Sequence, residues 1–310
     1  MLTLTIVERE LQGDVLMLTL ARDDGGPLPP FSAGAHIDLH IADRWVRPYS
    51  LCGDPQDRHC YRLGILKDSQ SRGGSLAAHT LQVGDRVQVS PPRNLFALAE
   101  DAPYSLLIGG GIGITPMLAM AAELHRAGRA FALHYCARSR HQAAFVAQLE
   151  SAPWAGRAWL HFSDRQRLDI DALLSDVPDD TQIYVCGPAR LMDGVKERAA
   201  AAGLPAGSVH QECFSAEVDT AGAAFEVVAA TRGIAVQVGA QQTIVEALAQ
   251  AGIAVCVSCK QGICGSCLTG VLEGEPDHRD SYLTEEERAD GDQILLCCSR
   301  ARGPRLVIDL

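Results

Sequence analysis

The chain has 310 residues, of which 47 % are hydrophobic and 21 % are charged, a composition typical of a globular protein long enough for two or three domains. Its formal net charge of −11 disfavours nucleic acid as a partner, because nucleic-acid-binding surfaces are basic. No apolar run approaches the ~20 residues that span a bilayer, and no basic leader precedes the first strand pattern. We therefore expect a cytoplasmic protein without membrane attachment.

Residues 1–100 carry short strand patterns separated by turn residues. Partial alternation marks strands at 3–7, 15–20, 36–41 and 86–89, with Pro-, Gly- and Asp-rich breakers between them. Many short strands at regular spacing predict a small antiparallel β-barrel.

Two polar motifs interrupt this region: Arg47-Pro48-Tyr49-Ser50 and Ser71-Arg72-Gly73-Gly74-Ser75. In the first, an arginine and a hydroxyl flank an aromatic residue, which suits a phosphate beside a flat ring. The second precedes a short helical pattern, where exposed N–H groups favour an anion. Each motif alone is also typical of an ordinary turn, but their co-occurrence favours a flavin-phosphate site.

The pattern changes near residue 101. An apolar run at 104–108 leads into Gly109-Gly110-Gly111-Ile112-Gly113-Ile114-Thr115-Pro116 and then a helical stretch to about residue 127. We expect Thr115 to cap this helix and Pro116 to lie in its first turn. A strand, a glycine turn and a helix N-terminus in this order can hold a dinucleotide pyrophosphate.

Alternating patterns follow, with strands expected at 130–136, 158–162 and 182–185 and helices at 142–149 and 170–175. They predict a doubly wound α/β unit, in which ligands bind at the carboxyl ends of the strands. A second glycine turn, Cys186-Gly187-Pro188, follows one such strand and fits a shared nucleotide crevice. The second strand ends without the acid that commonly binds the ribose of NAD; Arg138 and Ser139 there suit a 2′-phosphate, so NADPH stays possible.

Residues 215–224 form a small-residue linker pattern, and a hairpin is expected at 225–238. Thr243 and Glu246 form a capping-box pattern that opens an amphipathic helix ending at Gly252. Nine carboxylates lie between residues 273 and 292. Such a charge run is usually a solvated face, and the alternative is a docking surface for a basic protein partner.

Four cysteines have the spacing of plant-type [2Fe–2S] ligands: Cys259-x4-Cys264-x2-Cys267, followed by Cys297. Cys298 is the alternative fourth ligand, and Cys256 is expected not to ligate. A double CxxC formed by Cys256, Cys259, Cys264 and Cys267 could instead bind zinc, but it leaves Cys297 unused.

Together these motifs resemble the phthalate dioxygenase reductase and vanillate O-demethylase reductase group of the ferredoxin–NADP⁺ reductase superfamily. The resemblance implies a flavin-binding β-barrel (1–100), an NAD(P)-binding α/β domain (101–214), a linker (215–224) and an α+β plant-type ferredoxin domain of the β-grasp fold (225–310). It maps flavin contacts to Arg47, Tyr49, Ser50, Arg72, Gly73, Gly74 and Ser75. It maps nicotinamide-coenzyme contacts to Gly109, Gly110, Gly111, Gly113, Thr115, Pro116, Cys186, Gly187 and Pro188.

The implied activity is electron transfer from NADH through FMN and the cluster to a Rieske-type oxygenase or demethylase. Ser50, Cys186 and Phe214 are the expected residues beside the reacting rings. A reductase serving a cytochrome P450 is one alternative. A protein without enzymatic activity that binds zinc and a ligand is another.

Overall fold

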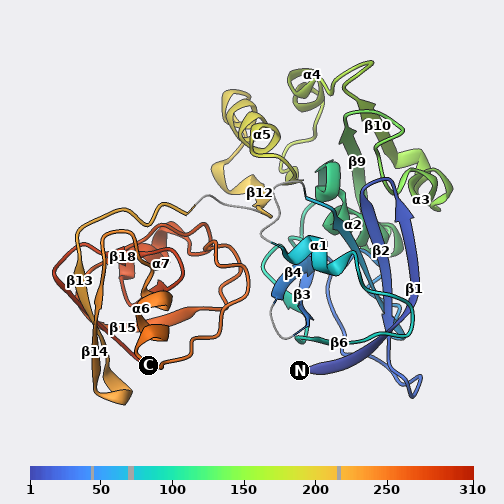
Figure 1. Cartoon of the computed structure of the whole chain (residues 1–310). Helices are drawn as coiled ribbons and strands as arrows, with labels where there is room; N and C mark the ends of the chain where they lie inside the picture. The colour runs from blue at the N-terminus through green and yellow to red at the C-terminus, as the bar shows by residue number, and fades with distance from the viewer. Residues whose placement is uncertain (43–44, 69–72, 215–217) are drawn as a thin grey trace. The chain divides into compact units, whose positions relative to one another are not determined.

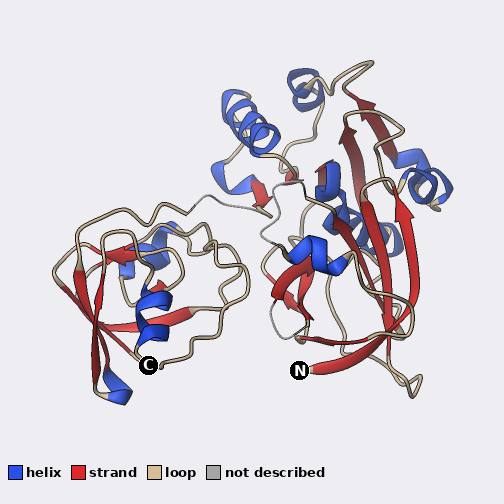
Figure 2. Cartoon of the chain, in the orientation of Figure 1, coloured by secondary structure: helices blue, strands red, loops and turns tan. Residues whose placement is uncertain are grey.

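The computed structural model describes residues 1–42, 45–68, 73–214 and 218–310, and its contacts divide the chain into two compact units, Met1–Glu212 and Cys213–Leu310 (Figure 1). Each unit combines β-sheet with short helices (Figure 2).

The first sheet of unit 1 is antiparallel, with strand order β4-β3-β6-β1-β2-β5 and with β7 paired to β3. Its two edge strands, β4 and β5, approach each other through a bridge between Leu51 and Leu63, so the sheet curls into a barrel. Apolar residues alternate into its core, as Ile37, Leu39 and Ile41 do along β3. The elements are β1 (Leu2–Gln12), β2 (Val15–Ala21), β3 (Ala35–Ile41), β4 (Trp45–Ser50), β5 (Cys60–Leu66), α1 (Gly74–Ala78), β6 (Arg86–Val89) and β7 (Arg93–Asn94).

The second sheet of unit 1 is parallel throughout, with strand order β10-β9-β8-β11-β12. Helices flank it, as the doubly wound prediction requires. The elements are β8 (Tyr104–Gly110), η1 (Gly111–Gly113), α2 (Ile114–Arg126), β9 (Ala130–Ala137), α3 (Val146–Ser151), η2 (Ala155–Arg157), β10 (Ala158–Phe162), α4 (Ile170–Ser175), β11 (Gln182–Cys186), α5 (Ala189–Ala201), η3 (Ala206–Ser208) and β12 (Val209–Glu212).

Two local predictions in this sheet are wrong. Thr115 does not cap α2: the helix begins at Ile114 with Gly113 at the N-cap, and the Thr115 hydroxyl donates to the carbonyl of Ile112. The helix expected from residue 142 begins only at Val146, because Phe145 has a left-handed backbone with φ 63°. The Phe145 N–H is bonded at 2.7 Å to the side chain of Gln12, a long-range contact that no local pattern reveals.

The barrel and the parallel sheet share one core. Met117 and Met120 on α2 belong to the same buried cluster as Val15, Ala33 and Phe96 of the barrel region. The Ala33 N–H also donates a hydrogen bond of 3.0 Å to the Glu123 carboxylate. Burial of this shared apolar surface explains why residues 1–212 form a single compact unit.

Unit 2 contains a five-stranded mixed sheet with strand order β14-β13-β19-β15-β17 and a separate pair, β16-β18. Helix α6 begins with the predicted capping box of Thr243 and Glu246, and α7 begins with a second one made by Thr284 and Glu287. The elements are β13 (Phe225–Ala229), η4 (Ala230–Arg232), β14 (Ile234–Val238), α6 (Ile244–Gln250), β15 (Leu268–Glu273), β16 (Pro276–Asp277), α7 (Glu285–Asp290), β17 (Gln293–Leu295), β18 (Arg300–Ala301) and β19 (Arg305–Ile308).

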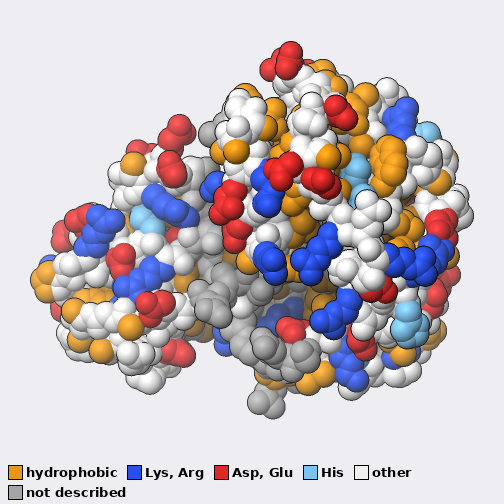
Figure 3. Space-filling model, turned by 90° about the horizontal axis from the view of Figure 1, so that it is seen from above, with side chains coloured by type: hydrophobic (Ala, Val, Ile, Leu, Met, Phe, Trp, Pro, Cys, Tyr) orange, Lys and Arg blue, Asp and Glu red, His pale blue; other side chains and the backbone are white. Residues whose placement is uncertain are grey.

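Charges of both signs are interspersed on the face of the molecule seen in Figure 3. Among the described residues, no helix combines the length and apolar character needed to cross a membrane.

Arg300 connects the first residues of unit 2 to its sheet. The residue is 2 % exposed. Its guanidinium donates hydrogen bonds to four backbone carbonyls at 2.7–3.0 Å. Two of these carbonyls, of Thr220 and Ala223, lie in the predicted linker, and the other two belong to Gly239 and Gln242. Part of the linker is therefore fixed to unit 2 by a single buried cation.

Replacing Arg300 with methionine should destabilise this part of unit 2 by about 3 kcal/mol or more, because four buried carbonyls lose their charged donor. Hydrogen exchange in peptides covering residues 219–242 should become about a hundredfold faster. The matched control is Arg302→Met, whose arginine is exposed and pairs with Glu275 at 2.7 Å. It should change stability by no more than about 0.5 kcal/mol. Equal exchange in the two variants would contradict the role given to Arg300.

Candidate cofactor sites

Strand β4 places the residues of the first polar motif beside helix α1. The Arg47 guanidinium lies 5.2 Å from the Trp45 ring centroid, and its Nη1 donates to the carbonyl of Val46. A Cβ on Gly74 would lie 2.7 Å from the Nε of Arg47, so the start of α1 packs directly against that side chain. Gly74 is thus brought to Arg47, Gly73 packs against the Trp45 ring, and the Ser75 hydroxyl accepts the Asp68 N–H at 3.3 Å. Arg72 lies outside the described residues.

Tyr49 carries the clearest sign of a missing partner in this region. Its Oη is buried and has no hydrogen-bond partner among the described residues. Burial raises the pKa of this phenol to about 12, so the group stays a neutral donor. A buried hydroxyl without a partner is costly in a folded protein, and a polar atom of a bound ligand would satisfy it.

The two predicted glycine turns of the parallel sheet lie against each other. Gly109 and Gly110 end β8, Gly111 and Gly113 form η1, and the buried residues Thr115 and Pro116 occupy the first turn of α2. A Cβ on Gly113 would collide with the carbonyl group of Cys186, and one on Gly110 would lie 2.9 Å from Pro188. The backbone of Gly187 packs on Gly110 in the same way. Only glycines permit this close approach, which brings the two turns together at the carboxyl ends of two neighbouring strands.

A hydrogen bond joins the barrel to this edge of the parallel sheet. Ser50, at the end of β4, donates its hydroxyl to the Oε2 of Glu212 at 3.2 Å. Glu212 ends β12 and pairs in register with Cys186, which itself pairs with Gly109. Ser50 and Cys186, predicted on separate motifs, are therefore brought to one place by Glu212.

Sequence reasoning missed Glu212. Burial raises the pKa of its carboxyl to about 8, while the hydrogen bond from Ser50 opposes that shift. The carboxyl is thus largely protonated near neutral pH and can hold a proton beside Ser50. A carboxylate at the end of the last strand of a parallel sheet was the available signal, because ligands bind at that edge.

Phe214, the third residue expected beside the reacting rings, begins unit 2 and is 38 % exposed. Its approach to a flavin stays a prediction.

The loop after β9 contains the arginines that suggested a 2′-phosphate site. Arg140 is held by Glu150 through two contacts of 2.7 and 2.8 Å, which leaves it poorly placed to bind a further anion. Arg138 is exposed and Ser139 is half-buried. Arg138 and Ser139 stay the predicted contacts for a coenzyme ribose.

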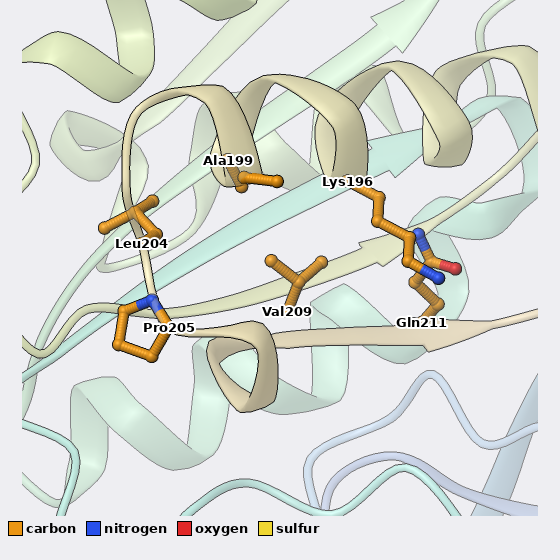
Figure 4. Close-up of a pocket in the computed structure, with 7 residues that line it drawn as sticks. Lys196, Ala199, Leu204, Pro205, Val209 and Gln211 are labelled. Carbon is orange, nitrogen blue, oxygen red and sulfur yellow. The ribbon is translucent and has the colours of Figure 1, made fainter. Parts of the chain in front are cut away.

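An apolar groove of about 250 Å³ lies elsewhere in unit 1, between α5 and β12 (Figure 4). Leu204, Pro205 and Val209 line it, with Lys196 and Gln211 toward one end (Figure 4). It contains neither glycine turn, so it is separate from the candidate coenzyme crevice.

In unit 2 the four predicted cluster ligands are buried and in mutual contact. The thiol of Cys259 is within hydrogen-bond reach of Cys264 and Cys297, and Cys267 is within reach of Cys297. Cys298 contacts Cys297 rather than replacing it in this set. Cys256 is exposed, which argues against the zinc set that includes it.

The four thiols share protons through hydrogen bonds among themselves. These bonds lower the pKa of Cys264 and Cys297 and raise the pKa of Cys259 and Cys267. The Gln261 N–H also lies 3.3 Å from the sulfur of Cys259. Backbone N–H groups directed at sulfur are the usual environment of an iron–sulfur cluster.

The residues present thus fit three groups: a flavin beside Tyr49 and Arg47, a nicotinamide coenzyme at the paired glycine turns, and a cluster within the four thiols. The fit rests on the unpartnered Tyr49 hydroxyl, the backbone cradle that a Cβ would fill, and an all-sulfur donor set.

Two domain families match the chain. An oxidoreductase NAD-binding domain matches residues 107–197, and a 2Fe-2S iron-sulfur cluster binding domain matches residues 228–302. The vanillate O-demethylase oxidoreductase of Pseudomonas sp. (strain HR199 / DSM 7063) is 48 % identical over 303 residues, which are 96 % of each chain.

Solved structures agree. Phthalate dioxygenase reductase, described as a modular structure for electron transfer from pyridine nucleotides to [2Fe–2S], is 37 % identical with a TM-score of 0.77, covering 100 % of this chain and 98 % of that one. An intact type IV self-sufficient cytochrome P450 monooxygenase is 41 % identical with a TM-score of 0.89, covering 99 % of this chain but 41 % of that one. The chain therefore belongs to the phthalate dioxygenase reductase and vanillate O-demethylase reductase group of the ferredoxin–NADP⁺ reductase superfamily, and it is an electron-transfer oxidoreductase that uses NADH, FMN and a [2Fe–2S] cluster.

Proposed function

We propose that this chain is the reductase component of a Rieske-type oxygenase or demethylase system. The observation that carries the proposal is that one chain joins a nicotinamide and flavin unit to a unit with four clustered thiols, over nearly the full length of the vanillate O-demethylase oxidoreductase. When bound, FMN takes up a hydride from NADH and releases electrons singly, and the cluster carries them one at a time.

The roles of the individual residues belong to the same proposal. Arg47, Tyr49, Gly73, Gly74 and Ser75 would hold FMN, together with Arg72, which lies outside the described residues. The backbone of Gly109, Gly110, Gly111, Gly113 and Gly187, with Thr115, Pro116 and Pro188, would hold the pyrophosphate and nicotinamide of NADH. Arg138 and Ser139 would face the ribose, and Cys259, Cys264, Cys267 and Cys297 would ligate the cluster.

Ser50, Glu212 and Cys186 would act where the two rings meet. The Ser50 hydroxyl and the protonated Glu212 carboxyl form a short hydrogen-bonded path on which a proton can be held and moved. Cys186 would act beside the nicotinamide through its place in the second glycine turn, where its backbone carbonyl lies against Gly113. Phe214, which the family resemblance predicts to approach the flavin ring, stays in the proposed set.

A reductase for a cytochrome P450 is the second candidate. The observation that favours it is the likeness to two-fifths of a self-sufficient cytochrome P450 monooxygenase. The division of unit 1 near residue 100 and the linker at 215–224 are part of the proposed domain plan under either function.

The partner can be identified by electron delivery. We expect purified Rieske-type oxygenases to be reduced by NADH in the presence of this protein much faster than cytochromes P450 are. Helix α7 carries four exposed carboxylates: Glu285, Glu286, Glu287 and Asp290. They follow Tyr282, whose ring packs against Gly265 in the cysteine loop, residues 259–267. If they dock a basic partner surface, raising the salt concentration from ~0.01 to ~0.15 M should slow partner reduction about tenfold.

Charge reversal tests the same surface. Glu285→Lys combined with Glu286→Lys should slow partner reduction, whereas Glu197→Lys on α5, an equally exposed carboxylate, should not. A rate that is independent of salt and unchanged in the Glu285→Lys/Glu286→Lys variant would remove the docking role of α7. Faster reduction of a P450 would favour the second candidate.

Cys264→Ser tests the modular path. One ligand is lost, so iron content and partner reduction should fall to background, while electron transfer from NADH to an artificial dye should stay near the wild-type rate. The measurement is an anaerobic NADH titration followed in the visible spectrum, with flavin and iron quantified on the same sample. Cys256→Ser is the control and should retain iron. Equal loss of dye and partner reduction would contradict the separation of the two units.

Glu212→Gln tests the buried carboxyl through stability. Folding raises the pKa of this carboxyl from 4.5 to about 8, so its protonated form favours the folded state. This contribution to the free energy of unfolding is complete below the unfolded pKa and is lost as the pH rises through about 8. Wild-type unit 1 should therefore lose on the order of 2 kcal/mol relative to the glutamine variant between about pH 5 and pH 8.

Tryptophan fluorescence can follow this change in unit 1 alone, because Trp45, Trp154 and Trp159 are the three tryptophans of the chain. Urea unfolding at several pH values gives the free energies. Glu197→Gln, which removes an exposed carboxylate, should leave the wild-type pH dependence intact. Parallel pH profiles for wild type and Glu212→Gln would refute the raised pKa.

A further inference from the structure

The segment that contains residues 278–288 lies against the cysteine loop at two points. The Ser281 N–H donates to the carbonyl of Gly262 at 3.0 Å. A Cβ on Gly262 would lie 3.0 Å from the Cα of Asp280, and a Cβ on Gly265 would collide with the ring of Tyr282. Both glycines are left-handed, with φ of 72° and 71°. The loop thus has no side chain where this segment covers it.

Asp280 organises that segment. Its side chain has 0 % relative exposure, and its Oδ2 accepts the N–H groups of Tyr282 and Leu283 at 3.1 and 2.8 Å. Arg288 lies 3.7 Å from the same oxygen and donates to the Asp280 backbone carbonyl at 2.6 Å. The carboxylate therefore fixes the turn that carries Tyr282 onto the loop.

The other carboxylate oxygen faces the residues around the fourth cysteine. Ser299 donates its hydroxyl to Oδ1 at 3.3 Å, and the Nδ1 of His278 lies 3.7 Å from that atom. Ser299 is two residues beyond Cys297 and contacts the sulfur of Cys298 at 3.7 Å. A Cβ on Gly262 would lie 2.6 Å from that same sulfur, so loop, Asp280 and Cys298 meet in one place.

A buried charge at this position has an electrical consequence as well as a structural one. Its hydrogen bonds come from two neutral N–H groups and one hydroxyl, and its cation, Arg288, is not in hydrogen-bond contact with it. Negative charge and hydrogen bonding close to an iron–sulfur cluster set its reduction potential, and burial strengthens the effect by lowering the local dielectric constant.

We propose that Asp280 is a positioning residue for the cluster. It ties the loop with three of the cysteines to the segment with the fourth, and its buried negative charge lowers the reduction potential of the cluster. This inference rests on the proposed ligand set of Cys259, Cys264, Cys267 and Cys297.

The charge is tested by Asp280→Asn, which keeps the size of the side chain and an oxygen for the two N–H groups. The measurement is the midpoint potential of the cluster in the full-length holoprotein, from an anaerobic redox titration read by EPR. We expect the potential to rise in Asp280→Asn. It should stay at the wild-type value in Asp290→Asn, which removes an equal but exposed charge from α7. Equal potentials in the two variants would overturn the electrical role.

The positioning is tested separately by Ser299→Ala, which keeps the charge but cuts the link to the segment after Cys297. Release of iron to the chelator bathophenanthroline should become about tenfold faster or more. Release at the wild-type rate would overturn the positioning role. If Asp280→Asn retains no cluster, this second variant alone decides. A wild-type protein without iron, or a cluster that survives Cys264→Ser, would refute the proposed ligand set instead.

Discussion

The hydrogen bond from Ser50 to Glu212 is the contact on which the proposed active site of unit 1 depends. It crosses 162 positions in the sequence and joins the last strand of the parallel sheet to the end of a barrel strand. Because Glu212 pairs in register with Cys186, and Cys186 with Gly109, the position of one carboxyl fixes the barrel edge relative to both glycine turns. A hydride can pass only between rings held at close contact, so this register is a condition for the reaction. The shared core around α2 gives the joint its rigidity, since the buried methionines of that helix pack on the barrel residues as well as on the sheet.

Features that depend on local sequence could be predicted well. The cysteine spacing, the glycine turns, the capping box at Thr243 and the alternation of strands and helices each arise from neighbours in the chain, and each corresponds to an element of the structure. The resemblance to a reductase family, which rested on those motifs, is confirmed by relatives that match nearly the whole chain.

The failures have a common physical cause: contacts between residues far apart in sequence. Thr115 is a residue type that often caps helices, but Gly113 packs closely against Cys186 and the helix begins at Ile114. The start of α3 is set by Gln12, which lies 133 residues away. Glu212, Asp280 and Arg300 look like ordinary surface charges in the sequence. Asp280 and Arg300 become buried hubs only because folding brings hydroxyls, N–H groups or carbonyls around them, and folding desolvates the Glu212 carboxyl beside Ser50.

Each unit contains a desolvated acid, Glu212 in unit 1 and Asp280 in unit 2. The two acids differ in the number of hydrogen-bond donors around them. In unit 1 the buried carboxyl faces a single hydroxyl, so burial outweighs hydrogen bonding and the group holds a proton near neutral pH. In unit 2 the Asp280 carboxylate receives three hydrogen bonds and has Arg288 3.7 Å away. A site that handles hydride beside a flavin gains from a group able to hold a proton. A site that handles only electrons gains from a fixed charge that does not change during turnover, because its potential then stays constant. The same residue type, a buried acid, is thus suited to two tasks by the number of donors that surround it.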